Sequence, residues 1–276
     1  MASVSTAEPA VRARGVSRPW RLIAAAFLVG SLLVGLGVAA GSGLGATLAI
    51  AYGHVGRSGQ LLPLAAFVGG LTAVAAAYVL GRSAGVARAA GAFVLAGVTV
   101  TLFLTAIQTF VQQQHTNTLR DVYAWLLGGF STATWHDVAI CAPYIAASSI
   151  VLVLHRRVLD VLSLGDDEAA SLGVDVARAR LAIVVAATLG TAAAVSVSGL
   201  IAFVGIIVPH TIRLLVSTSY RAVVPLSLAV GAGFLVLTDV VARTVLSPAE
   251  LPIGVVTAFL GAPFFAVVLR TARGVR

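Results

Sequence analysis

Between Arg180 and Arg213 the chain has the sequence LAIVVAATLGTAAAVSVSGLIAFVGIIVPHTI (residues 181–212), which contains no charged side chain. A membrane-spanning helix needs about 20 apolar residues. This run of 32 residues is therefore too long for one span and short for two. Cytoplasmic loops are enriched in arginine, and arginines lie at both ends of the run. Keeping both ends on one side of the membrane requires two crossings, which we predict to turn at residues 196–199.

The rest of the chain has the same apolar character. Of its 276 residues, 59% are apolar and 10% are charged, whereas ordinary soluble domains carry roughly 25% charged residues. Too few polar residues remain to cover a soluble fold, so we expect most of the surface to face lipid. The sequence predicts an all-α, polytopic transmembrane helical bundle of about eight spans. The six other predicted spans are 22–53, 58–81, 89–111, 138–155, 223–246 and 253–269, of which only 223–246 holds charged residues.

The positions of the arginines predict the orientation. The net charge of +8 comes from 18 arginines, no lysine and ten acidic residues. With the N-terminus in the cytoplasm, 15 of the 18 arginines fall on the cytoplasmic side, so the charge indicates topology rather than nucleic-acid binding. Both termini are then cytoplasmic. Residues 1–19 are predicted to be a disordered cytoplasmic tail, and residues 20–276 a transmembrane domain.

Several kinds of chemistry are excluded or disfavoured. Without lysine the chain has no phosphate-binding loop of the GxxxxGKS/T type, so we do not expect it to be an ATPase itself. Cys141 is the single cysteine, and the five histidines show no ligand spacing, so no metal site and no catalytic residue is predicted. Asp239 and Arg243 lie four residues apart within a predicted span, which favours an ion pair within one helix over a substrate contact.

One cytoplasmic connection, residues 158–177, stands out by its acidic side chains. It holds five of the ten acids of the chain. Gly165 is expected to end one short helix, Asp166 to cap the next, and Gly173 to end that second helix. Two interpretations remain open for this segment: a solvated connector, or a helix on which a cytoplasmic partner docks.

Several motifs in this chain resemble those of the FecCD-type permeases, which belong to ABC importers for iron-siderophores, haem and vitamin B12. GDDEAASLGV (165–174) resembles the family's coupling segment, and GLIAFVGIIVPHTIR (199–213) its GxxxFVGxxxPHxxR signature. PAELPIG (248–254) with LGAPF (260–264) is similar to its last-helix motif. WLLGGFS (125–131) is similar to its short outer helix, and GVAAGSGLG (37–45) to the start of its third span.

The resemblance implies a set of partners and of functional residues. The partners are a cytoplasmic ATP-binding subunit that carries ATP and Mg²⁺, an external substrate-binding protein, and a second permease copy or paralogue in the bilayer of a prokaryotic cell membrane. The chain itself is expected to bind no cofactor and no nucleic acid. The residues implied in ATPase coupling are Asp166, Asp167, Glu168, Ala169, Ala170, Ser171, Leu172 and Gly173. The residues implied in the family signature or in gating are Gly199, Phe203, Gly205, Pro209, His210, Arg213, Glu250, Pro252, Gly254, Gly261 and Pro263.

Two further groups follow from the same resemblance. The family's translocation path, here between residues 89–114 and 253–269, would be lined by polar side chains that share one helix face: Thr101, Thr105, Gln108 and Gln112. Helix packing through their polar groups is the alternative. Arg57 and Arg120 are the candidates for docking the binding protein. His210 and Arg213 have the further alternative of anchoring a helix at the headgroup level.

The chain departs from the family pattern at one place. The family's second span, with its flanking R-x-P-R and R-N-P-L-A segments, is not recognisable, and the first span leads directly into the third. Iron-siderophore complexes are the cargo that we expect first, with haem or cobalamin as alternatives, while a zinc or manganese permease is disfavoured by the signature. A shortened membrane scaffold that docks an ATPase without transport is the alternative from another functional class.

Overall fold

The computed structural model describes residues 37–53, 61–83 and 89–273, and the secondary structure in these ranges is helical. This confirms the predicted all-α class. The disordered tail predicted for residues 1–19, the first part of the first span, and Arg57 lie outside the described residues. The helices are Gly37–Tyr52, α2 (Leu61–Ser83), α3 (Ala89–Gln114), η2 (Thr116–Thr118), α4 (Leu119–Leu126), α5 (Trp135–Leu154), α6 (Arg156–Leu162), α7 (Asp166–Ser171), α8 (Val176–Ser198), α9 (Val204–Leu215), α10 (Tyr220–Thr244) and α11 (Ile253–Arg273).

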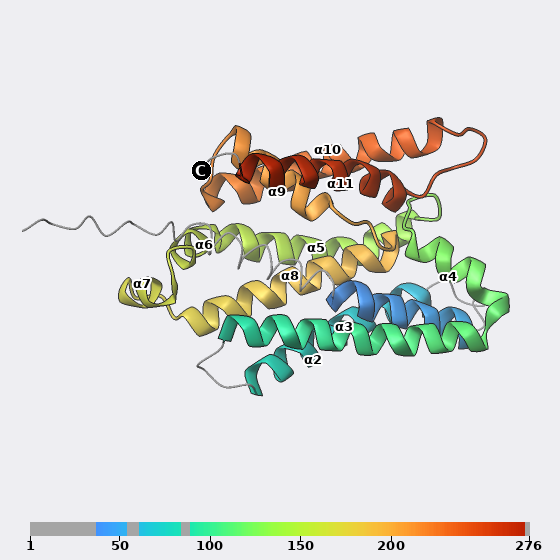
Figure 1. Cartoon of the computed structure of the whole chain (residues 1–276), viewed down its shortest axis with the longest axis horizontal. Coiled ribbons are helices and arrows are strands. Elements are labelled where there is room, and N and C mark those ends of the chain that lie inside the picture. Colours follow the sequence, from blue (N-terminus) through green and yellow to red (C-terminus); the bar gives the residue numbers. More distant parts are fainter. Residues whose placement is uncertain (1–36, 54–60, 84–88, 274–276) are drawn as a thin grey trace, which may run out of the picture.

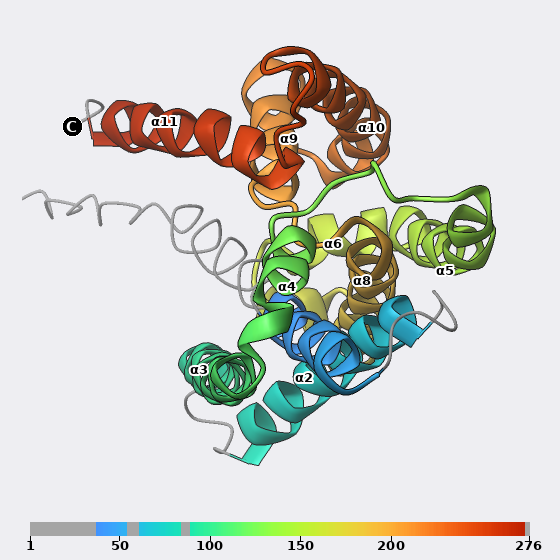
Figure 2. The same ribbon diagram turned by 90° about the vertical axis from the view of Figure 1, so that its right-hand side faces the viewer.

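The long helices form two groups (Figure 1). Helix Gly37–Tyr52, α2, α3, α5 and α8 make the first group, which we call the main bundle; within it α5 packs along α8, and α2 packs on both α3 and α8. Helices α9, α10 and α11 make the second group, the C-terminal layer, in which α9 packs on α10. Figure 2 shows α11 reaching outward from the rest of this layer.

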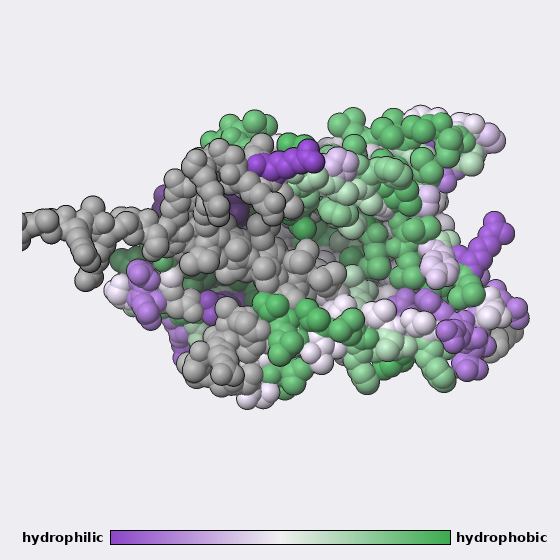
Figure 3. All heavy atoms as spheres, viewed as in Figure 1, coloured by the Kyte–Doolittle hydropathy of each residue, from purple (hydrophilic) through white to green (hydrophobic). Residues whose placement is uncertain are grey.

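The helices fit a membrane in length and composition. Five of them, in α2, α3, α5, α8 and α10, are long and apolar enough to cross a bilayer, and three shorter apolar helices lie at Gly37–Tyr52, Val204–Leu215 and Ile253–Val268. These eight segments occupy the positions of the eight predicted runs, although the number of crossings and their direction stay predictions. Among the coloured residues of the visible face, apolar ones predominate between the two ends, and hydrophilic residues gather at the end near α4 and around α7 (Figure 3).

The predicted turn inside residues 181–212 is confirmed. Helix α8 ends at Ser198, and Gly199 follows with φ 67° and ψ −162°, a conformation that glycine adopts readily and other residues avoid. After this turn the chain is not helical until α9, which has 12 residues. Phe203, the N-cap of α9, has φ 67°, so the helix cannot begin before it. Pro209 lies inside α9, which continues through it.

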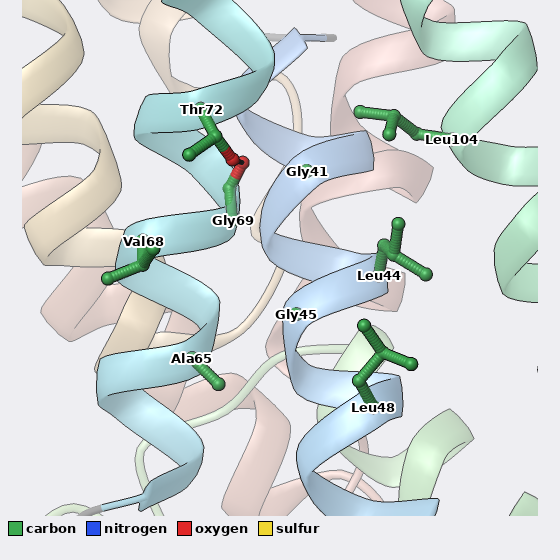
Figure 4. A pocket seen from close by; sticks show the side chains of 9 residues that line it. All are labelled: Gly41, Leu44, Gly45, Leu48, Ala65, Val68, Gly69, Thr72 and Leu104. Atoms are coloured by element: carbon green, nitrogen blue, oxygen red, sulfur yellow. Dashed lines mark hydrogen bonds between the residues drawn. The ribbon is translucent and has the colours of Figure 1, made fainter.

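Small residues allow the closest helix approach in the main bundle (Figure 4). A Cβ on Gly41 would overlap the carbonyl group of Gly69, and a Cβ on Gly45 would overlap the carbonyl of Ala65. Glycines four residues apart let two helix backbones meet, which is a common packing device in membranes. An apolar groove of about 310 Å³ lies beside this crossing and extends to Leu104 of α3.

Candidate functional site

Three motifs that are far apart in the sequence meet at the end of the bundle opposite α7. The backbone N–H of Gly129 donates to the carbonyl of Ser198 (2.9 Å), the N–H of Ile253 to that of Gly128 (3.1 Å), and the N–H of Gly254 to that of Leu127 (3.1 Å). These bonds join the segment after α4 to the end of α8 and to the start of α11. We call residues 127–129, 198–200 and 253–254 the glycine junction.

The glycines of this junction are required by space and by backbone conformation. A Cβ on Gly199 would overlap the carbonyl oxygen of Trp125, and a Cβ on Gly254 would overlap that of Leu127. Gly128 has φ 71°, and its own Cβ would come within 3.0 Å of the carbonyl oxygen of Leu200. The backbones of the three segments of the glycine junction therefore touch without side chains between them, and they join α4, α8 and α11 at this end of the bundle.

Phe203 extends the connection from α9 to α11. A Cβ on Gly261 would overlap Cβ, Cγ and Cδ1 of Phe203, so this side chain lies directly on the glycine surface of α11. The Phe203 ring is 6.2 Å from that of Phe265, and His210 meets Phe264 edge-on at 5.9 Å between ring centroids. The structure thus brings Phe203 and His210 of the signature against the helix that carries Gly254 and Gly261.

The other signature residues lie apart from this cluster. Gly205 has open space around it, and Glu250 and Pro263 are exposed. Pro252 stands just before α11, where its carbonyl accepts from the N–H of Val255 at 3.1 Å. Arg213 lies in the last turn of α9, and its guanidinium is 4.8 Å above the centre of the Tyr220 ring of α10.

The acidic segment 158–177 contributes to two short helices, α6 and α7, and α7 projects past the ends of α5 and α8 (Figure 1). Gly173, with φ 82°, ends α7 as predicted, and its N–H donates to the carbonyl of Ala170 at 2.9 Å. The predicted cap at Asp166 is wrong. Gly165 occupies the N-cap position with φ 133°, a conformation that suits glycine, and Asp166 is the first helical residue.

The side chains of α7 divide into an exposed and a buried set. Asp167, Glu168 and Ala170 are exposed, and Leu172 is 64% exposed just after the helix. Ala169 is fully buried, so of the three apolar residues expected to contact a partner, only Ala170 and Leu172 are accessible. An exposed leucine next to exposed carboxylates offers both apolar contact and charge pairing at one place.

One carboxylate of the acidic segment 158–177 has a specific partner in a distant helix. Asp160 of α6 accepts the backbone N–H of Tyr220 (2.6 Å) and the hydroxyl of Ser219 (2.8 Å), and Arg221 Nε lies 3.7 Å from it. It therefore caps α10, which begins 60 residues later in the sequence. Ser219 is the N-cap of α10, and serine is a residue type that the sequence can mark as a cap. Nothing in the sequence around Ser219 indicates that Asp160, 59 positions earlier, is its hydrogen-bond partner.

The four polar residues predicted to line a pathway all lie on α3 but not in one environment. Gln108 is buried, with its amide group next to Gly43 of helix Gly37–Tyr52, and Thr101 Oγ1 is buried as well. Thr105 is exposed and Gln112 is partly exposed. Gln108 therefore packs inside the main bundle, and Thr105 and Gln112 remain the accessible pair.

The remaining predicted charges have clear positions. Arg243 Nε donates to Asp239 Oδ2 at 2.9 Å, which confirms the predicted pair within α10. Arg120 is exposed on α4, at the end of the bundle opposite α7.

Comparisons with known proteins agree on one family. A model of the FecCD transport family matches residues 28–271. The chain is 38% identical over 244 residues to YvrB of Bacillus subtilis, an uncharacterized ABC transporter permease protein, covering 87% of this chain and 69% of YvrB. It is 38% identical over 235 residues to the cobalamin import system permease protein BtuC of Halobacterium salinarum, covering 85% of this chain and 62% of that protein.

Two further similarities extend this result. The vitamin B12 import system permease protein BtuC of Yersinia pestis is 36% identical over 244 residues, covering 87% of this chain and 71% of that protein. A metal-chelate type ABC transporter solved in an inward-facing conformation superimposes with a TM-score of 0.79 at 29% identity, covering 92% of this chain and 85% of that chain. The chain thus spans about two thirds of the length of these curated relatives.

Proposed function

Because the chain belongs to the FecCD transport family, we propose that it carries metal chelates across the cell membrane as the permease subunit of an ABC importer. The permease role, the multi-pass membrane location and the lack of catalytic activity in this subunit follow from the family. The family also implies an ATPase partner and a dimeric permease. The identity of the chelate, the form of the dimer and the docking surfaces are the parts that we propose.

The observation that carries the proposal is the placement of α7. In a chain whose surface is largely apolar, this short helix projects from one end of the bundle with Asp167, Glu168 and Leu172 exposed (Figures 1 and 3). A partner that binds α7 gains apolar contact and charge pairs at one place. We therefore assign the ATPase docking surface to Asp167, Glu168, Ala170 and Leu172.

The docking surface is tested by reversing one charge. Glu168→Arg places a cation where we expect basic side chains of the ATPase, so co-purification of the ATPase and ATP-dependent uptake are both expected to fall at least tenfold. Asp121→Arg is the matched control for ATPase co-purification only, because Asp121 is an exposed acid in α4 at the opposite end of the bundle but lies next to Arg120, the proposed contact of the binding protein. Normal ATPase binding by Glu168→Arg would remove α7 from the interface.

The cargo that we propose is an iron-siderophore complex, with cobalamin and haem as the alternatives. The relatives named as cobalamin or vitamin B12 import permeases favour cobalamin among the alternatives. Ferric siderophores, cobalamin and haem are all metal chelates. Proteoliposomes that contain this chain, its ATPase and its binding protein are to be given a radiolabelled ferric siderophore, cobalamin or haem in parallel. ATP-dependent uptake of one of them identifies the cargo. An assembled complex that takes up none of them would favour the non-transporting scaffold.

The binding protein is proposed to dock at the end opposite α7, where Arg120 is exposed on α4. Arg57, the other predicted docking residue, lies outside the described residues. Arg120→Glu is expected to weaken stimulation of ATP hydrolysis by the binding protein at least fivefold, while basal hydrolysis is unchanged. Equal stimulation of the variant and the wild type would remove Arg120 from this surface.

A further inference from the structure

The two helix groups are connected near α7 chiefly through α6 and α10. Helix α10 of the C-terminal layer packs on α6, and more extensively on α6 than on α5. The covalent connections of the α6–α7 segment run elsewhere, to α5 before it and to α8 after it, and both belong to the main bundle. A force applied at α7 therefore reaches the main bundle directly through the chain. Along the chain it reaches α9 only at the far end of α8, after Ser198, so a direct path to the near end of α10 needs a noncovalent link.

Asp160 supplies such a link. Its Oδ1 accepts the Tyr220 backbone N–H at 2.6 Å, and its Oδ2 accepts the Ser219 hydroxyl at 2.8 Å. The side chain is only 27% exposed, and Arg221 Nε lies 3.7 Å from Oδ2. Hydrogen bonds to an ionised acceptor are stronger than neutral ones, and a negative charge at a helix N-terminus is favoured by the helix dipole. The contact is thus short, charged and directional.

Both sides of this link are themselves firmly held. On one side, the Ser163 hydroxyl donates to the Asp160 carbonyl at 2.6 Å, the Leu164 N–H donates to the Val161 carbonyl at 3.1 Å, and α6 and α7 are in contact. On the other side, the guanidinium of Arg213 lies over the Tyr220 ring, so the start of α10 is also tied to the end of α9. The path from α7 to the C-terminal layer is continuous.

We propose that Asp160 is a positioning residue that makes the C-terminal layer move together with α7 when the ATPase closes. This inference rests on the proposed docking of the ATPase at α7. Asp160 acts through its contacts with the start of α10. Its loss should therefore separate ATP hydrolysis from movement of the C-terminal layer, rather than lower both activities equally.

The chain offers a matched control in the same cytoplasmic segment. Asp175 also caps a helix, accepting the Arg178 backbone N–H at 3.1 Å and pairing with Arg178 Nε at 3.1 Å. Its partners, however, belong to α8 and therefore to the main bundle. Asp160→Ala and Asp175→Ala both remove a capping carboxylate, but only the first removes a contact between α6 and α10.

The experiment measures chelate taken up per ATP hydrolysed in proteoliposomes that contain the whole transporter and the chelate carried by the wild type. Asp160→Ala is expected to lower this ratio at least fivefold with the ATPase still bound. Asp160→Asn, which keeps an acceptor oxygen, is expected to recover part of the loss, and Asp175→Ala to stay within twofold of the wild type. An unchanged ratio in Asp160→Ala, whether or not uptake and hydrolysis both fall, would overturn the proposal.

A second measurement does not depend on transport. Amide hydrogen exchange of the permease–ATPase complex, with and without ATP and vanadate, is expected to change in α9–α11 of the wild type but not of Asp160→Ala. Equal nucleotide-dependent changes in both proteins would overturn the role of Asp160. A wild-type complex that takes up no chelate overturns the proposed function instead, and the exchange measurement then still decides the role of Asp160.

Discussion

The backbone N–H of Gly254 donates a 3.1 Å hydrogen bond to the carbonyl oxygen of Leu127, although 127 residues separate the two in the sequence. The bond joins the first turn of α11 to the chain that leaves α4. Gly199 completes the same junction from α8, because a Cβ there would overlap the carbonyl oxygen of Trp125. Helices from both groups are therefore held together at one end by backbone contacts that only glycine permits.

Gly199→Ala is expected to destabilise the folded protein. The substitution combines a backbone conformation that costs about 1–3 kcal/mol for other residues with an overlap onto the Trp125 carbonyl. The measurement is the thermal unfolding midpoint of the purified chain in detergent. Gly205→Ala is the control, because a Cβ there meets open space within α9. Equal midpoints for the two variants would show that the junction yields without cost.

Phe203 and Gly261 are expected to be energetically coupled. Gly261→Ala places a methyl group in overlap with the Phe203 side chain and should destabilise the wild type, whereas the same change should cost much less in a Phe203→Ala background. Unfolding of the two single variants and the double variant gives the coupling, for which we expect about 1–2 kcal/mol, within the range of residues in contact. Additive effects would contradict the packing of this ring on α11.

The sequence predicted those features that depend on local patterns. The end of α7 at Gly173 and the Asp239–Arg243 pair follow from glycine chemistry and from charge spacing within a few residues. The all-α class and the turn at residues 196–199 follow from the lengths of the apolar runs and from the arginines that flank them. The placement of the apolar helices likewise follows from charge-free length.

The features that were missed depend on contacts between distant segments. Asp160 caps a helix that begins 60 residues later, and nothing near Asp160 in the sequence marks it as different from the other acids of its segment. Ala169 is buried and Gln108 faces Gly43 because of how the helices meet, which a helix-face pattern does not reveal. The predicted N-cap of α7 was wrong by one residue. Aspartate is a preferred N-cap, but here Gly165 takes that position with a φ of 133°, which glycine adopts more easily than other residues.

Cys141 is expected to report opening of the contact between α5 and α8. It is 8% exposed, its Sγ lies 3.3 Å from the Ala193 carbonyl, and Ser148 donates to the Ala186 carbonyl at 2.7 Å two turns away. A Cβ on Gly190 would overlap the Ser148 hydroxyl. Gly190→Leu should therefore separate the helices and accelerate maleimide labelling of Cys141 at least tenfold.

The labelling experiment has an internal control. Gly231→Leu adds the same side chain to α10, where a Cβ meets nothing within 4 Å, and should leave the labelling rate unchanged. Because Cys141 is the only cysteine in the chain, the whole signal comes from this contact. Rapid labelling of the wild type itself would contradict the observed burial.

Asp239 and Arg243 are expected to behave as a structural pair. A lone charge in an apolar span costs about 2.5–3.5 kcal/mol on insertion scales, so Asp239→Leu and Arg243→Leu should each lower the yield of folded protein in the membrane. The double variant removes both charges and should recover most of that yield. Recovery with normal chelate uptake establishes the structural role, whereas recovery without uptake would indicate a contact with the cargo. A double variant that folds worse than either single variant would contradict the pairing.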